Sequence, residues 1–227
     1  MLAYANITLY FWQVLFSMRR REELVISKLS TGYYSLLTTM DTLHREDAYQ
    51  LLTEYTKSAS LMKHALAVEA LMKAYARKFG EDENRWGIVG LLHDFDYEQY
   101  PTAEDHPLKG AAILEEKGYP EDVIYAIKTH ADYLNLPRNS LMDKTLFAVD
   151  ELSGLLTAAA LVQPQKTIHT VKVKSVKKKL KDKAFARSVN RDDIRKGVEE
   201  LGVDLGEHIA FCIEAMKEVA ADLGLDG

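Results

Sequence analysis

The sequence predicts an all-α protein, and three observations support this fold class. From Asp47 onward, apolar residues recur at steps of three and four, which places them on one face of a helix. Serine, proline and glycine stand where these stretches begin and end, as they do at helix termini. No sustained alternation of apolar and polar residues indicates a strand. A chain of 227 residues, 47% of them hydrophobic, is long enough to bury a substantial core.

Two periodic stretches carry the first polar residues that interrupt an apolar face. The first covers residues 58–80 and places His64 at a buried position, with a serine to cap its start and a glycine to end it. The second covers residues 83–93. His93 and Asp94 therefore fall at its C-terminal end, where the chain enters a polar loop.

Three later stretches add further polar residues at inward positions. A third helix opens at His106, because the proline that follows it fits the first turn of a helix. A fourth helix begins at Pro120 and carries His130 on its apolar face. A long fifth helix over residues 141–161 places Asp150 among apolar and small residues.

The pattern divides the chain into a core and two flanking parts. Residues 41–165 form the expected domain core, and residues 166–227 are expected to add C-terminal helices packed on the same domain. Residues 1–40 form an apolar extension that contains three consecutive arginines. This extension is either a peripheral helix, sequence upstream of the true start, or a membrane anchor through residues 1–21. The anchor is the least favoured, because the apolar stretch is short and holds several polar groups.

Charge and cysteine content narrow the classes of function. The net charge of -5 argues against nucleic acid as the main partner, although residues 166–196 hold a cluster of basic residues. The single cysteine, Cys212, lies in an apolar run, so the chain has neither an internal disulfide nor a cysteine cluster for zinc. This composition is typical of a protein of the reducing cytoplasm.

Six polar residues at inward or helix-end positions predict a metal site. Each alone is more often a hydrogen-bonded core residue than a ligand. If all six were buried without partners, each would destabilise the fold by about 1 to 3 kcal/mol. A bound metal would remove this cost. Imidazoles with carboxylates favour iron, manganese or zinc, with magnesium as a further candidate. The six candidate ligands are His64, His93, Asp94, His106, His130 and Asp150.

In order and spacing, these residues resemble the HD superfamily of metal-dependent phosphohydrolases. The resemblance covers roughly residues 58–161, and it implies a helical bundle with the metal site at its centre. It also implies two ions. The first ion would be held by His64, His93, Asp94 and Asp150. The second would be held by His106 and His130, with Asp94 as the bridging ligand.

The implied reaction is hydrolysis of a phosphoester in a small phosphorylated metabolite or nucleotide by a metal-activated hydroxide. Asp94, His106 and His130 are the expected catalytic residues. With a single ion, the two histidines would orient the phosphate or donate a proton to the leaving group.

Candidate substrate-binding residues come from the same motif and from the basic segment. Many HD proteins continue the His-Asp pair as His-Asp-Ile-Gly-Lys, and Tyr97 stands here in place of that lysine. A phosphate contact from this position is therefore in doubt. Lys174, Lys178 and Lys181 could instead hold the phosphate, or could form a solvated helical face.

Two alternative functions share the same ligands. Mixed-valence di-iron oxygenases of the HD type use a similar ligand order to activate oxygen. Oxygen uptake that depends on substrate would distinguish them from a hydrolase, which would release phosphate. A non-catalytic metal-binding signalling module is a second alternative, and the intact ligand set speaks against it.

Overall fold

A computed structural model of the chain describes residues 43–227. These residues form α-helices and two short 3-10 helices, with no strand among them, which confirms the predicted all-α class. The predicted extension of residues 1–40, including the possible anchor, lies outside the described residues. Among the described helices, none combines the length and apolar character needed to cross a membrane. The elements are α2 (Arg45–Tyr55), α3 (Ala59–Phe79), α4 (Glu83–Leu92), α5 (Leu108–Glu116), α6 (Glu121–Thr129), η1 (Asp132–Leu134), α7 (Leu141–Leu161), η2 (Ile168–Thr170), α8 (Val173–Lys181), α9 (Arg191–Leu201), α10 (Leu205–Lys217) and α11 (Ala220–Leu223).

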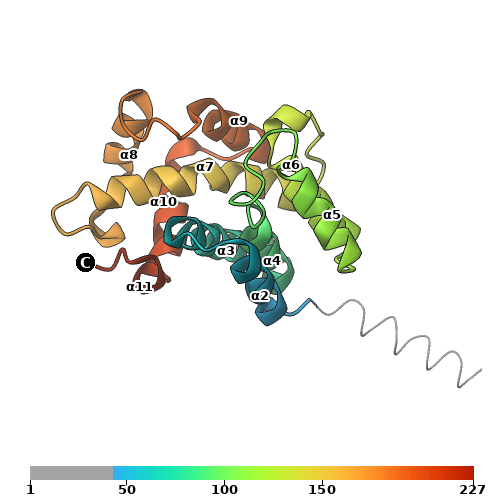
Figure 1. Cartoon of the computed structure of the whole chain (residues 1–227). Coiled ribbons are helices and arrows are strands. Elements are labelled where there is room, and N and C mark those ends of the chain that lie inside the picture. The colour runs from blue at the N-terminus through green and yellow to red at the C-terminus, as the bar shows by residue number, and fades with distance from the viewer. Residues whose placement is uncertain (1–42) are drawn as a thin grey trace, which may run out of the picture. The chain divides into compact units, whose positions relative to one another are not determined.

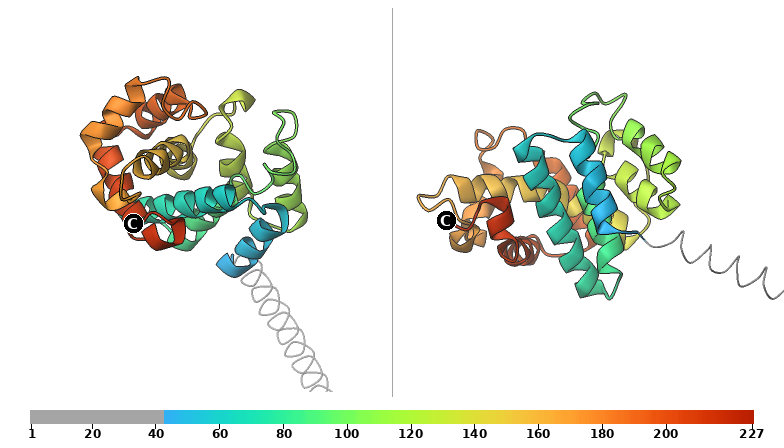
Figure 2. Two further views of the ribbon diagram at one scale, coloured as in Figure 1. Left: turned by 60° about the vertical axis from the view of Figure 1, so that its left-hand side comes forward. Right: turned by 60° about the horizontal axis from the view of Figure 1, so that its bottom comes forward.

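Two long helices, α3 and α7, organise the packing (Figure 1). They contact each other, α4 packs along α3, and α9 packs along α7. In the left view of Figure 2, α7 is seen nearly end-on, with α3 on one side of it and α8 and α9 on another. Both long helices bury an apolar face completely, as the periodicity predicts. Fully buried members of these faces are Val68, Leu71, Met72, Leu146, Val149, Leu152 and Leu156.

Helix ends place the polar residues beside this core. A capping box of Ser140 and Asp143 fixes the start of α7. Asp82 caps α4 by accepting from the Arg85 backbone N–H, and α4 then ends at His93. The third predicted helix starts two residues later than expected, because His106 lies in the turn before α5.

Close contact between helices depends on two glycines. Gly90 of α4 lies where a Cβ atom would stand 2.8 Å from the Val68 carbonyl oxygen of α3. Gly197 of α9 lies where a Cβ atom would stand 2.6 Å from the Ala148 Cα atom of α7. Since the obstructing atoms belong to the backbone, neither contact can be relieved by a side-chain rotation.

A buried histidine of α10 links this helix to α3 and α7 through hydrogen bonds. Tyr75 donates its hydroxyl hydrogen to His208 Nδ1 across 2.5 Å, and His208 Nε2 donates to the Ala148 carbonyl oxygen across 3.0 Å. His208 is only 1% exposed, and burial lowers its pKa. The neutral imidazole is therefore part of the packed core.

Gly197→Ala should lower the free energy of unfolding by about 1 to 3 kcal/mol, because α9 must move away from α7. Gly154→Ala is the matched control, since the nearest atom to a Cβ there is Val189 Cγ2 at 3.7 Å. The control should be neutral or stabilising by up to about 1 kcal/mol, because alanine favours a helix. Chemical denaturation of both variants measures the difference, and equal losses would contradict the close contact.

The substitution His208→Gln should weaken the pH dependence of the free energy of unfolding at acidic pH. Because the folded pKa of His208 is depressed, the unfolded chain binds more protons, and stability is lost as pH falls below about 6.5. Glutamine can keep both hydrogen bonds without titrating. Denaturation over a pH series should show a slope smaller by up to about 1.4 kcal/mol per pH unit. Parallel profiles would contradict the burial of a neutral imidazole.

Candidate metal centre

All six predicted ligands lie at one place, although five different segments carry them. His64 comes from α3, His93 and Asp94 from the end of α4, His106 from the loop before α5, His130 from the end of α6, and Asp150 from α7. Five of them form two groups of potential metal ligands that share Asp94, and Asp150 lies against His64 and His93. We call the group on one side the first ligand cluster (His64, His93 and Asp150) and the group on the other side the second ligand cluster (His106 and His130).

The first ligand cluster brings two imidazoles against a carboxylate. His64 Nε2 lies 3.0 Å from Asp150 Oδ1, and His93 Nε2 lies 3.4 Å from the same oxygen. The two Nε2 atoms are 3.1 Å apart. Asp94 Oδ2 faces this group, at 3.5 Å from His93 Nε2 and 3.8 Å from His64 Nε2.

The second ligand cluster repeats the arrangement around the other oxygen of Asp94. Both His106 Nε2 and His130 Nε2 lie 3.2 Å from Asp94 Oδ1, and they are 3.3 Å from each other. Asp94 thus presents one oxygen to each cluster. A carboxylate in this position can bridge two cations.

The Nδ1 atom of each of the four imidazoles, which points away from the centre, also has a hydrogen-bond partner. His93 Nδ1 donates to the Gly90 carbonyl oxygen and His130 Nδ1 donates to the Ile127 carbonyl oxygen. His106 Nδ1 contacts Asp96 Oδ1 at 2.8 Å, and His64 Nδ1 contacts Ser153 Oγ at 3.1 Å. A hydrogen on Nδ1 leaves the lone pair of Nε2 directed at the centre, as a metal ligand requires. The donor set therefore fits one or two divalent ions.

Opposite charges stabilise the centre. Burial opposes protonation of His93, but Asp94 and Asp150 outweigh it and raise its pKa to about 9. Burial likewise opposes protonation of His106, whose pKa is raised to about 9 by hydrogen bonds to Asp94 and Asp96. Despite burial, the imidazoles hold the pKa values of Asp94 and Asp150 below their usual range. Ionised carboxylates at this place attract cations, and a metal would displace the imidazole protons.

A cavity of about 740 Å³ opens beside both clusters. Its lining includes Tyr97, but not Lys174, Lys178 or Lys181, which are exposed on α8. Among residues 43–227, no lysine or arginine lines the cavity, whereas Glu151 and Asp193 do. Burial and the neighbouring Asp150 raise the pKa of Glu151 to about 7. The predicted role of the three lysines in phosphate binding thus gains no support from their position.

Several contacting residues were not predicted from the sequence. Asp96 accepts from His106 on one side and from the Gly110 backbone N–H at 2.7 Å on the other. Ser153 Oγ is the hydrogen-bond partner of His64 Nδ1, and Tyr133 donates its hydroxyl hydrogen to the His106 carbonyl oxygen. Asp96 carried a visible signal, since it stands two residues after Asp94. Tyr133 carried none, because it lies in η1, a 3-10 helix of three residues that is too short for a periodic pattern.

Comparison with known proteins gives a consistent result. The HD domain family matches residues 61–155. The chain is 26% identical over 171 residues to Ribonuclease Y of Oleidesulfovibrio alaskensis, covering 75% of this chain and 28% of that protein. It is 30% identical over 106 residues to Ribonuclease Y of Nitratidesulfovibrio vulgaris, covering 46% of this chain and 20% of that protein. The chain thus spans less than a third of the length of these relatives. No solved structure gives a significant match.

The matched segment contains the predicted ligands and the helices α3 to α7 that carry them. It coincides with the part of the sequence in which the resemblance was found. Residues 61–155 match the HD domain family, and this match together with the similarity to Ribonuclease Y supports an HD-superfamily phosphohydrolase.

Proposed function

We propose that the chain hydrolyses a phosphoester of a small phosphorylated metabolite or nucleotide at a centre of two divalent transition-metal ions. The observation that carries the proposal is the orientation of the four histidines. Each directs Nε2 at the shared carboxylates while its Nδ1 is engaged outside the centre. The first ligand cluster with Asp94 would hold one ion, and the second ligand cluster with Asp94 the other. Iron, manganese and zinc suit these ligands best.

Bound divalent ions lower the pKa of water and offset charge on phosphoryl oxygens. The oxygen of water would join the phosphorus atom while the bond from phosphorus to the alcohol oxygen breaks and that oxygen takes a proton. The side chains position the reactants: Asp94 faces both clusters, and His106 and His130 line the cavity, as do His64 and Asp150. The part of the cavity lining that the structure describes supplies no lysine or arginine for the phosphate.

RNA is a second candidate substrate, favoured by the relatives, which are named Ribonuclease Y. The sequence did not predict nucleic acid as a partner, because the net charge is -5. RNA binding depends on phosphate contacts by lysine and arginine, and the described residues of the cavity lining include neither. We therefore place phosphomonoesters first and RNA phosphodiesters second.

Metal analysis combined with a phosphoester screen tests the proposed centre. Protein purified without added metal should contain transition metal and release phosphate from members of the screen. Asp94→Ala should abolish both metal binding and activity, because both clusters lose a ligand, whereas His106→Ala should preferentially empty one site. His169→Ala is the control, since this exposed histidine pairs only with Asp226 among the described residues.

Each alternative has its own outcome in the same experiment. Substantial hydrolysis by Asp94→Ala would end the proposed mechanism. Oxygen uptake that depends on substrate, without phosphate release, would identify an oxygenase. Cleavage of RNA oligonucleotides alone would replace the first substrate class with the second. Bound metal without turnover on any substrate would indicate a signalling module.

Asp96→Ala should weaken metal binding at the second ligand cluster by about 10- to 100-fold, because His106 loses the partner that orients its ring. The first ligand cluster should keep its affinity, since no contact joins it to Asp96. Titration with metal, followed by calorimetry, separates the two sites. Glu104→Ala is the control, since it removes an exposed carboxylate from the same loop. Equal weakening of both sites would show that Asp96 acts through the fold instead.

A further inference from the structure

Two partly exposed tyrosines line the cavity beside the second ligand cluster. Tyr97 is 41% exposed and Tyr133 is 49% exposed. Both contact His106: the ring of Tyr97 meets the imidazole edge-on at 5.1 Å, and the Tyr133 hydroxyl donates to the His106 carbonyl oxygen at 2.5 Å. Exposed aromatic side chains in a cavity indicate a surface that a ligand covers, because their apolar area otherwise faces water.

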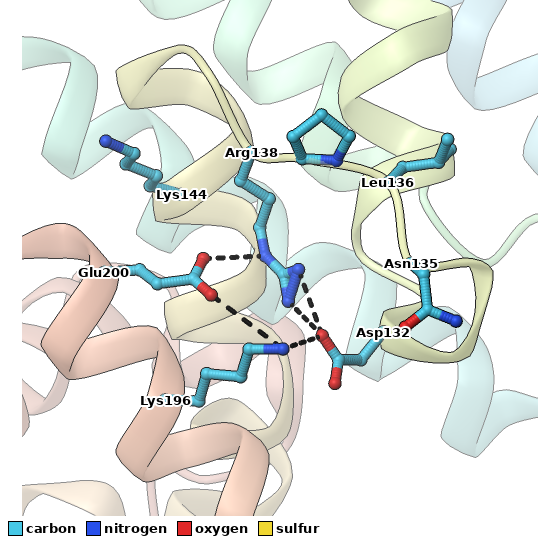
Figure 3. A pocket seen from close by; sticks show the side chains of 8 residues that line it. Asp132, Asn135, Leu136, Arg138, Lys144, Lys196 and Glu200 are labelled. Atoms are coloured by element: carbon cyan, nitrogen blue, oxygen red, sulfur yellow. Dashed lines mark hydrogen bonds and ion pairs between the residues drawn. The ribbon is translucent and has the colours of Figure 1, made fainter.

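The segment that carries Tyr133 is held on its other side by a network of charged side chains around the buried Arg138. Figure 3 shows Asp132 facing Arg138 and Lys196, with Glu200 on the far side of both cations. Asp132 Oδ1 lies 2.5 Å from Arg138 Nη2 and 2.5 Å from Lys196 Nζ, and Arg138 Nε lies 3.1 Å from Glu200 Oε2. The Arg138 side chain is only 4% exposed. Since Asp132 begins η1, this network holds the tyrosine next to it in place before any ligand binds.

The same network keeps the cationic groups of Arg138 and Lys196 out of the cavity lining. The guanidinium of Arg138 lies 3.4 Å above the ring of Phe147, which itself lines the cavity. Arg138 and Lys196 face a separate depression of about 400 Å³, where Asp132 and Glu200 offset their charge. Their cationic groups are therefore committed to carboxylates and are not available to a second phosphate in the cavity.

The chemistry of the cavity wall defines the part of the substrate that lies beyond the phosphate. The wall offers aromatic side chains at Tyr97 and Tyr133 and hydrogen-bond acceptors at Glu151 and Asp193. An additional phosphate would meet carboxylates there. A neutral planar ring with amino groups would stack on the tyrosines and donate to the carboxylates.

We propose that Tyr97 and Tyr133 form a stacking surface for the base of a nucleoside monophosphate whose phosphate binds the metal centre. This inference rests on the proposed phosphoester hydrolysis and names its substrate class. The fixed position of Tyr133 lowers the cost of ordering the ring when the base binds. The tyrosines act as specificity-determining residues, and the ligand clusters act on the phosphate alone.

The test compares AMP with ribose 5-phosphate, which has a phosphoester on the same sugar but lacks the base. Wild-type protein should hydrolyse AMP with a kcat/KM that exceeds the value for ribose 5-phosphate about tenfold or more. Tyr97→Ala and Tyr133→Ala should each raise the KM for AMP about fivefold or more, and should leave ribose 5-phosphate unchanged. Tyr133→Phe keeps the ring and should stay within about twofold of wild type. Tyr49→Ala is the control, because this exposed tyrosine on α2 is absent from the cavity lining.

Metal content and calorimetric binding keep the outcomes distinct. Each variant must retain wild-type metal content, so that a changed KM reports on the base and not on the ions. If AMP and ribose 5-phosphate react equally well, or if the alanine variants weaken both alike, the stacking surface is refuted while the proposed hydrolysis stands. If no phosphoester is hydrolysed, the proposed function fails. Affinities for AMP and ribose 5-phosphate measured on metal-loaded protein then still decide the stacking proposal, which equal affinities would refute.

Discussion

The arrangement of the site depends on one carboxylate that is shared between two pairs of imidazoles. Asp94 turns Oδ1 to His106 and His130 and Oδ2 to His64 and His93. For this to happen, the end of α4 must lie within a few ångströms of α3, α6 and the loop before α5. The close approach of α4 to α3 at Gly90 is therefore part of the same requirement, since a bulkier residue would move the pair His93 and Asp94 away from His64.

Helix ends fulfil two tasks in this centre. The last carbonyl groups of a helix have no partner within it. His93 follows α4 and His130 follows α6, and each donates Nδ1–H to a carbonyl three residues earlier, in Gly90 and Ile127. The free carbonyl is satisfied, and the imidazole is turned with Nε2 toward the centre. His106 lies in a loop without such a carbonyl, and Asp96 takes its place.

Helical periodicity made most of the fold and the six candidate ligands predictable. A spacing of three and four specifies which face of a helix a side chain occupies, so His64 and Asp150 could be placed inward without a structure. Outside the α-helices this argument fails, which is why Asp96, in the loop after α4, and Tyr133, in the short 3-10 helix η1, were missed. The lysines of the basic segment were selected by charge alone, and charge does not specify position: the cavity lining does not include Lys174. The divisions at residues 40 and 165 stay predictions.

The absence of lysine and arginine from the cavity lining, as far as residues 43–227 form it, links metal binding to substrate binding. Glu151 and Asp193 face the cavity, so an incoming phosphate meets negative charge unless cations occupy the ligand clusters. Under the proposed function, the affinity for the phosphate then depends on metal occupancy, whereas stacking on the tyrosines does not. A ligand without phosphate would thus bind in the absence of metal, and the two contributions to substrate recognition are physically separable.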